Sequence, residues 1–284
     1  MSFDIKFSHD WAWVDLSVNR NIGSDVTLLT IGDSWTWGDE LGTSCGLASS
    51  PCNDTEYRTS KVFGNLLSEK LNCNWVQSAL PGAGWGYIIY EFEKLLPQLV
   101  TQTEKIIAVL GFSDHGRELS NFDVADTDEF ARLYLNGFVG NRPLKELLTD
   151  VESAYYQRID NLLANYPTVQ CIAAPVFSSH LTQQPYHTDR QWVDLLFDYT
   201  LDPCYSYTSG IWTIDQYLQH HKLHSEQYKE EIYNYWFPAM VKRQAEMDAN
   251  NLLFDRWHPT EQGHELWANY LYEHINENSY TYLR

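Results

Sequence analysis

Four short apolar runs, each bounded by turn residues, stand out along the chain. They cover Val26–Ile31, Asn74–Ser78, Lys105–Leu110 and Val169–Ala173. Short continuous apolar runs that are rich in β-branched residues are typical of strands buried on both faces of a sheet. The pattern therefore predicts four buried strands.

Between and after these runs, apolar residues recur every three or four positions, which is the period of an amphipathic helix. Helices are predicted at Thr59–Leu71, Trp85–Val100, Leu144–Tyr166 and Thr260–Ile275. Alternating strands and helices favour a parallel sheet with helices on both faces. The predicted fold class is therefore α/β.

Several stretches do not belong to this alternation. Residues 1–23 precede the first strand and are predicted to be an N-terminal extension, and residues 175–250 form a long insertion rich in Trp and Tyr. No Pro/Gly/Ser linker separates the insertion from the rest of the chain, so we interpret it as a lid on one domain. That domain is expected to span residues 1–284.

Composition and charge exclude several classes of protein. The chain has 284 residues, with 19 basic and 38 acidic side chains and a formal net charge of −19. Such a charge repels nucleic-acid phosphates, and no apolar run approaches the roughly 20 residues of a membrane helix. The first residues mix acids with apolar side chains, unlike a signal peptide. We expect a globular protein made in the cytoplasm, without nucleic-acid or membrane partners.

The cysteines and histidines give no pattern that is typical of a metal site. Five cysteines lack paired metal-ligand spacing and are expected to be free thiols, although a Cys45–Cys52 bridge stays open. The histidines of residues 220–224 are more typical of a solvated helix face than of a metal site. The acidic residues 123–129 lack the glycine and final glutamate of a calcium loop. No metal or cofactor is predicted.

Chemistry is first suggested where the first predicted strand ends, in the sequence Ile31-Gly-Asp33-Ser34-Trp. Ligand sites in open parallel sheets lie outside the carboxyl ends of the strands. A serine at such a position is accessible to a substrate, and its amide can face an oxyanion. Ser34 is therefore a candidate nucleophile, although Gly-Asp-Ser on its own also occurs in ordinary turns.

A second candidate lies near the end of the chain, where Asp255-Arg-Trp-His258-Pro precedes the last predicted helix. This spacing allows Asp255 to accept a hydrogen bond from Nδ1 of His258, which leaves Nε2 free to take a proton from a hydroxyl. A lone histidine is usually structural, and an aspartate before a helix is usually a cap. With Ser34 upstream, the pair supplies a base and its orienting acid.

Two more segments follow predicted strands at the same sheet edge. Gly82 lies in Leu-Pro-Gly-Ala-Gly after the second strand, where a glycine lets the backbone approach a ligand and offer an N–H to negative charge. A simple strand-to-helix turn explains it equally well. Gly111-Phe-Ser113-Asp114 follows the third strand, so three strand ends converge on one place.

Together these blocks resemble the SGNH/GDSL hydrolase superfamily. Gly-Asp-Ser at 32–34, the glycine at 82, Gly-Phe-Ser-Asp at 111–114 and Asp-Arg-Trp-His-Pro at 255–259 stand in the family's order. The resemblance implies a three-layer, flavodoxin-like α/β/α fold and ester hydrolysis. It implies that Ser34 is the nucleophile and first oxyanion donor, Gly82 the second donor, His258 the base and Asp255 its partner.

One position departs from the family's pattern. Its third oxyanion donor is an asparagine side chain, and the matching residue here is Ser113, whose hydroxyl has a shorter reach. Arg117 is a candidate to compensate, and Asp33 and Asp114 are candidate supporting residues. The residues in these four motifs are also similar to those of SGNH-like proteins from bacteriophages. Association of this protein with a virion is therefore an alternative.

The expected activity is hydrolysis of small acyl esters, with O-acetyl esters of a carbohydrate preferred. The acidic composition and a mean hydropathy of −0.41 disfavour an enzyme of lipid interfaces. Trp35, Trp37, Trp85 and tryptophans of the 192–236 region are candidates for stacking on sugar rings. The alternatives are a catalytically weakened carbohydrate-binding or virion structural protein, and a thioesterase or arylesterase. The oligomeric state is left open.

Overall fold

A five-stranded sheet forms the centre of the molecule. The computed structural model describes residues 18–19, 25–39, 41, 55–112, 144–176, 188, 192, 254–255 and 258–278. Within these residues the strand order is β1-β3-β2-β4-β5. The strands are β1 (Val18–Asn19), β2 (Val26–Gly32), β3 (Asn74–Ala79), β4 (Lys105–Gly111) and β5 (Val169–Ala173). β1 runs antiparallel to β3 at one edge, and the other four strands are parallel.

The order of the parallel strands indicates where a ligand would bind. β2 lies between β3 and β4, so in chain order the four parallel strands run 2-1-3-4, as in flavodoxin-like sheets. The chain leaves β2 for β3 on one side and then crosses to β4 on the other. A crevice for ligands is expected at this reversal, outside the carboxyl ends of β2 and β4.

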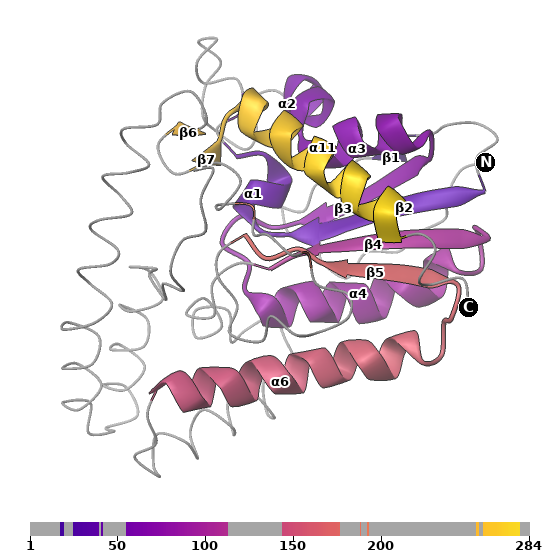
Figure 1. Cartoon of the computed structure of the whole chain (residues 1–284), viewed down its shortest axis with the longest axis vertical. Helices are drawn as coiled ribbons and strands as arrows, with labels where there is room; N and C mark the ends of the chain where they lie inside the picture. Colours follow the sequence, from indigo (N-terminus) through magenta and orange to yellow (C-terminus); the bar gives the residue numbers. More distant parts are fainter. Residues whose placement is uncertain are drawn as a thin grey trace.

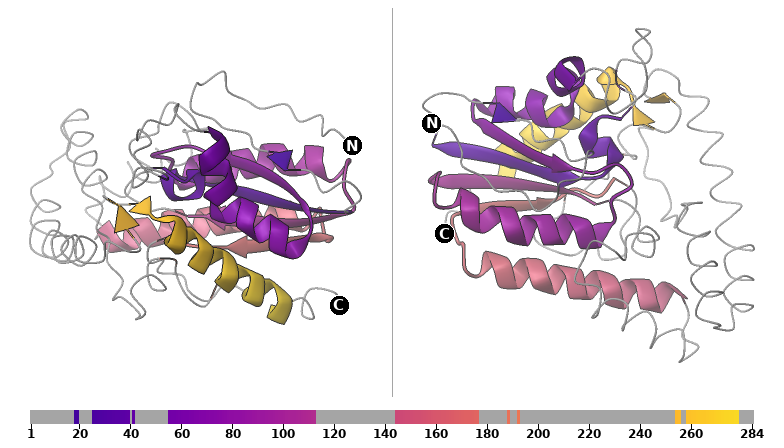
Figure 2. Two further views of the ribbon diagram at one scale, coloured as in Figure 1. Left: turned by 90° about the horizontal axis from the view of Figure 1, so that it is seen from above. Right: turned by 180° about the vertical axis from the view of Figure 1, so that it is seen from behind.

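Helices cover both faces of this sheet. The described helices are α1 (Ser34–Trp37), α2 (Thr55–Lys61), α3 (Phe63–Leu71), α4 (Trp85–Leu99), α6 (Leu144–Leu163) and α11 (Glu261–Asn278). α4 and α6 lie on one face, and α3 and α11 lie on the other (Figures 1 and 2). The three-layer α/β/α fold with a flavodoxin-like sheet is therefore confirmed.

The four predicted strands are confirmed almost to the residue. β5 has the predicted bounds, and β2, β3 and β4 each extend one residue further, to Gly32, Ala79 and Gly111. The strands are buried along nearly their whole length, with only the first residue of β2, β4 and β5 partly exposed. Burial on both faces explains why their sequences read as continuous apolar runs.

One predicted helix, Thr59–Leu71, is two helices in the structure. The break falls at Val62, whose extended backbone (φ −69°, ψ 145°) caps α3 without a side-chain hydrogen bond. Instead, Nδ1 of His264 accepts the hydrogen bond of the Phe63 N–H at 3.2 Å. A contact across 201 residues thus sets this boundary, and a local periodicity cannot contain it.

Three very short strands were not predicted. β1 lies within the predicted N-terminal extension and pairs with Trp75 and Val76 of β3. β6 (Phe254–Asp255) and β7 (His258–Pro259) form a separate antiparallel pair before α11. Two residues are too few to show a period. Apart from four residues, the predicted insertion at 175–250 lies outside the described residues, and the single-domain division stays a prediction.

None of the helices in the described ranges is both long and apolar enough to cross a membrane.

Candidate active site

Ser34 lies directly beyond the carboxyl end of β2. The strand ends at Gly32, Asp33 caps the next helix, and Ser34 is the first residue of α1. Oδ1 of Asp33 accepts a hydrogen bond from the backbone N–H of Trp35 at 2.9 Å. Ser34 is 4% exposed. This serine therefore lies at the reversal of strand order, in a capped helical turn with little access to solvent.

Two glycines at neighbouring strand ends allow α1 to pack against the sheet. Gly32 and Gly111 are opposite each other in the register of β2 and β4. A Cβ atom on Gly32 would lie 2.0 Å from Oγ1 of Thr36, and one on Gly111 would lie 2.4 Å from the same atom. Only glycine leaves room for Thr36 here, so the glycine before Asp33 has a packing role that fixes the position of α1.

Hydrogen bonds also fix the end of α1. Gly38 has φ +79°, and its N–H and that of Asp39 both donate to the carbonyl of Ser34 at 3.0 Å. Nη1 of the buried Arg58 donates to the carbonyl of Trp37 at 2.6 Å, and its guanidinium lies 3.8 Å from the ring centroid of Trp37. Burial lowers the pKa of Arg58 to about 10, so it remains a cation at neutral pH.

His258 reaches the same helical turn from the other end of the chain. β6 and β7 pair so that Asp255 and His258 are directly opposite each other. Both views of the ribbon put this pair next to α1, beyond the carboxyl end of β2 (Figures 1 and 2). Nε2 of His258 lies 3.9 Å from Oδ2 of Asp39, and the two side chains are 16% and 23% exposed.

Asp39 is a residue that the sequence patterns did not single out. Its backbone N–H donates a hydrogen bond to the carbonyl of Ser34, and its carboxylate lies beside the imidazole of His258. The only signal in the sequence is its place after the glycine that ends α1. Aspartate after glycine is common in turns, so this signal is weak.

Gly82 lies in the turn between β3 and α4. It has φ +83°, a conformation that favours glycine, although a Cβ atom there would meet nothing within 4 Å. The N–H of Leu80 donates to the carbonyl of Gly32 at 3.0 Å, and the N–H of Ala83 donates to Leu80 at 2.9 Å. The turn with Gly82 is therefore hydrogen-bonded to the end of β2, at the residue before Asp33.

A second histidine near the site, His264, was not singled out by the sequence patterns, because it lies inside the regular period of α11. It is fully buried against Phe63 and Trp192. Burial lowers the pKa of His264 to about 3, and the positive charge that His258 can carry adds to this effect. Because Nδ1 accepts from Phe63, the neutral ring carries its hydrogen on Nε2.

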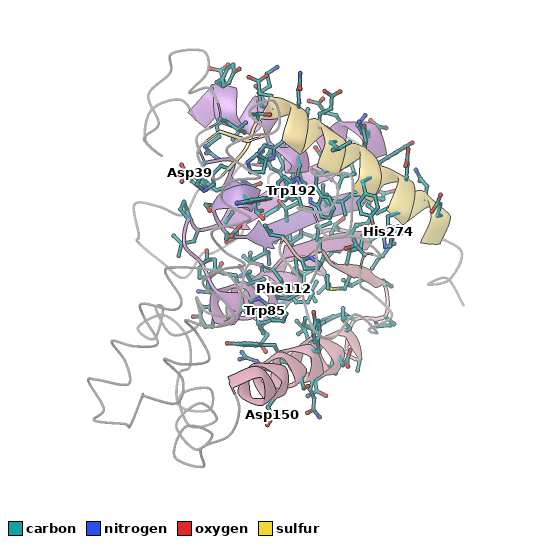
Figure 3. The ribbon with its side chains drawn as sticks, turned by 60° about the vertical axis from the view of Figure 1, so that its left-hand side comes forward. Asp39, Trp85, Phe112, Asp150, Trp192 and His274 are labelled. Atoms are coloured by element: carbon teal, nitrogen blue, oxygen red, sulfur yellow. The ribbon has the colours of Figure 1, made fainter. Side chains whose placement is uncertain are left out.

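The tryptophans near the strand ends belong to the core. Trp35, Trp85 and Trp192 are each 1% exposed and Trp37 is 4% exposed, so the prediction that they stack on sugar rings is wrong. Trp85 stacks on Phe112 with 4.2 Å between ring centroids, and Trp35 and Trp192 pack edge to face with 5.2 Å between ring centroids. Figure 3 shows Trp192 on one side of the sheet and Trp85 with Phe112 on the other. Aromatic content alone does not distinguish a packed ring from an exposed one.

Other predicted residues lie outside the described part of the chain. These are Ser113, Asp114 and Arg117, both members of the Cys45–Cys52 pair, and the histidine and acidic segments at 220–224 and 123–129. The two described cysteines, Cys73 and Cys171, are free thiols, as predicted, and both are buried. Burial raises the pKa of Cys73 to about 11, which disfavours the nucleophilic thiolate form at neutral pH. In the described ranges no cluster of three His, Cys, Asp or Glu side chains could hold a metal ion.

Comparison with known proteins returns solved structures only. No protein-family model matches the chain, and no curated protein sequence is significantly similar to it. A family two carbohydrate esterase from Clostridium thermocellum in complex with cellohexaose is 14% identical, with a TM-score of 0.38 over 90% of this chain and 65% of that one. The chain thus spans just under two thirds of the length of that esterase.

Two further structures have similar scores. A protein from Desulfitobacterium hafniense, described as a lipolytic protein of the G-D-S-L family, is 16% identical, with a TM-score of 0.36 over 87% of this chain and 98% of that one. A catalytic mutant of an acetylxylan esterase from Geobacillus stearothermophilus is 14% identical, with a TM-score of 0.35 over 90% of this chain and 96% of that one. At these scores, a function for this chain has to be argued from its own site.

Proposed function

We propose that the protein is a serine esterase of the SGNH/GDSL type that removes small acyl groups, with O-acetyl esters of a carbohydrate as the preferred class. The observation that carries the proposal is that His258 lies next to α1, the helix that begins with Ser34, at one end of the sheet (Figure 1). Asp39 is bonded to the Ser34 carbonyl and lies 3.9 Å from Nε2 of His258. Asp255 is the cross-strand neighbour of His258.

In the proposed reaction, Nε2 of His258 takes the proton of the Ser34 hydroxyl while Oγ attacks the ester carbonyl. The alcohol leaves with the proton from His258, and water then releases the acid from the acyl-enzyme. Asp255 is assigned to hold the other ring nitrogen, since directly opposite residues of an antiparallel pair are close enough to interact. Its negative charge would stabilise the imidazolium.

The backbone amides of Ser34 and Gly82 are assigned to the oxyanion. The hydrogen bond from Leu80 to Gly32 supports this assignment, because it ties the turn with Gly82 to the segment that leads into Ser34. Ser113 is assigned as the third donor, with Arg117 and Asp114 in support. Loss of one such donor typically costs on the order of 100- to 1000-fold in turnover. Asp33 acts through the cap that it gives to α1.

The substrate class follows from exposure and charge. Ser34 is only 4% exposed, which favours a small acyl group over a long one. A net charge of −19 and a mean hydropathy of −0.41 favour a neutral, polar acyl carrier over a lipid surface. The described tryptophans give no support to carbohydrate binding, because they are buried. Release of acetate from acetylated polysaccharides tests the carbohydrate directly.

Two experiments test the proposal. Wild type should hydrolyse p-nitrophenyl acetate faster than the octanoate and should release acetate from acetylated polysaccharides. Ser34→Ala should lower kcat/KM by roughly 1000-fold or more. Asp255→Asn should lower kcat by a similar factor with little change in KM. An unchanged rate in Ser34→Ala, or a preference for octanoate, would contradict the proposal.

The rival, a carbohydrate-binding or virion protein with a weakened site, is favoured by one observation, the serine at position 113. A fluorophosphonate probe separates the two readings. An active serine esterase should be labelled on Ser34 and not in Ser34→Ala. Folded wild-type protein that takes up no label would favour the rival.

A further inference from the structure

The core on the α4 side of the sheet contains a polar chain of three side chains that the proposed reaction does not use. Ser78 is fully buried, and Tyr87 and Glu91 are each 1% exposed. Oγ of Ser78 donates to Oε2 of Glu91 at 3.1 Å and lies 3.2 Å from the hydroxyl oxygen of Tyr87. Aliphatic and aromatic residues surround them, including Leu29, Ile31, Ile88 and Phe92.

The direction of the hydrogen bonds follows from their chemistry. A carboxylate only accepts, so the hydroxyl hydrogen of Ser78 points to Glu91 and the Tyr87 hydroxyl donates to Ser78. Burial raises the pKa of Tyr87, and the nearby charge of Glu91 raises it further. Tyr87 therefore stays a neutral donor at any physiological pH. The result is one ordered relay from Tyr87 through Ser78 to Glu91.

Such a relay is costly if it serves only to fill the core. Taking a carboxylate out of water costs several kcal/mol before its hydrogen bonds are counted, and apolar residues of similar volume are often as stable or more stable. Neighbouring positions on α4 hold Ile88, Phe92 and Leu95, which pack without any such cost. The position of the relay therefore needs another explanation.

The relay spans the two ends of the turn that contains Gly82. Ser78 is the last residue but one of β3, and Tyr87 and Glu91 lie in the first two turns of α4. The cap of α4, Gly84, makes no side-chain hydrogen bond, and Gly82 has φ +83°. The side chains of Ser78, Tyr87 and Glu91 therefore link the strand and the helix on either side of this turn. Two backbone hydrogen bonds, from Leu80 to Gly32 and from Ala83 to Leu80, also hold this turn.

We infer that Glu91 is a positioning residue, which acts through Ser78 and Tyr87 to hold the turn that carries Gly82. The inference rests on the proposed function, in which the N–H of Gly82 stabilises the oxyanion. An amide that moves by a fraction of an ångström loses much of its effect on the transition state. Glu91 thus affects kcat without touching the substrate.

The first test measures the turn itself, with no need for enzyme activity. Glu91→Leu removes the acceptor, Glu91→Gln keeps an acceptor at the same place, and Glu93→Gln is the matched control on the same helix. Glu93 is partly exposed and pairs with Arg158. Hydrogen exchange of the peptide that covers residues 80–84 should accelerate about fivefold or more in Glu91→Leu and little in the other two.

The second test measures turnover of p-nitrophenyl acetate. Glu91→Leu should lower kcat roughly tenfold with KM within about twofold, and Glu91→Gln should recover most of the loss. Unchanged exchange of residues 80–84 together with wild-type kcat in Glu91→Leu would overturn the inference. If Glu91→Leu does not fold, Tyr87→Phe removes one hydroxyl of the same relay and should change both readouts in the same direction. If wild type has no esterase activity, the proposed function fails, and the exchange measurement still decides whether Glu91 holds the turn.

Discussion

Mild acid is expected to weaken this fold through one buried imidazole, His264, at the junction of α3 and α11. Its Nδ1 accepts the N–H of Phe63, the first residue of α3, which has no other acceptor within the helix. Protonation of Nδ1 would remove that acceptor and leave a charge in a fully buried site. The folded protein therefore resists protonation of His264.

The size of the effect follows from the difference between the folded and unfolded states. The ordinary pKa of a histidine is 6.5, and burial lowers the pKa of His264 to about 3. Between these values the unfolded chain binds a proton that the folded chain does not. Stability is thus complete above about pH 6.5 and falls by about 1 kcal/mol for each pH unit below it. At pH 5 the loss amounts to about 1–2 kcal/mol.

Urea unfolding of the full chain at half-unit steps from pH 8 to pH 5 measures this loss. His264→Asn keeps an oxygen near the position of Nδ1 but does not titrate, so its free energy of unfolding should depend less on pH. The smaller side chain should also cost about 1–3 kcal/mol at pH 8. His274→Asn, at a partly exposed position of the same helix, should keep the wild-type slope. If His264→Asn loses stability toward pH 5 as steeply as wild type, the reasoning is refuted.

Three further substitutions test the geometry around Ser34. Gly32→Ala puts a Cβ atom 2.0 Å from Oγ1 of Thr36 and should cost about 3 kcal/mol of stability, measured by urea unfolding. Gly82→Ala meets no neighbour but keeps φ +83°, so it should cost only about 1–2 kcal/mol while lowering kcat. Asp39→Asn removes a negative charge 3.9 Å from Nε2 of His258 and should lower kcat/KM severalfold at pH 7, an effect that 0.5 M salt should not reproduce in wild type.

What could be predicted from the sequence depended on how local the cause was. Buried strands can be recognised in the sequence because the side chains of β2 and β4 pack against the helix layers on both faces of the sheet. The whole segment is therefore apolar. The position of Ser34 beyond a strand end could be predicted because it follows from the end of such a strand. The break at Val62 could not be found, since His264 lies 201 residues away from the amide that it caps. Asp39 escaped notice for the same reason, because its neighbour His258 comes from the far end of the chain.

The tryptophans show a different limit. Trp35 and Trp85 each follow a strand end within a few residues, which is where a ligand-stacking ring would also lie. Whether such a ring faces solvent depends on what covers it. Trp35 is covered by Trp192, which belongs to no regular predicted element, and Trp85 by Phe112. Tertiary packing thus determines whether these tryptophan rings face solvent, which composition and position in the sequence do not show.

The buried ionisable groups suggest why this end of the molecule is built as it is. Among the described residues, the acidic and basic side chains that are buried are Asp33, Arg58, Glu91 and His264. Asp33 and Arg58 bind the backbone of α1, which begins with Ser34. Glu91 braces the turn of Gly82, and His264 joins α3 to the first turn of α11, just after His258.

Burial of a charged group costs free energy, and Asp33, Arg58 and Glu91 each contact α1 or an element that flanks the turn with Gly82. A protein selected for stability alone would not gather such costs at one end of its sheet. The arrangement is expected where a few atoms must be held in fixed positions for chemistry. Replacing Ser78, Tyr87 and Glu91 together by apolar residues should therefore preserve or raise the free energy of unfolding while lowering turnover, and a variant that gains in both would argue that the relay is only part of the core.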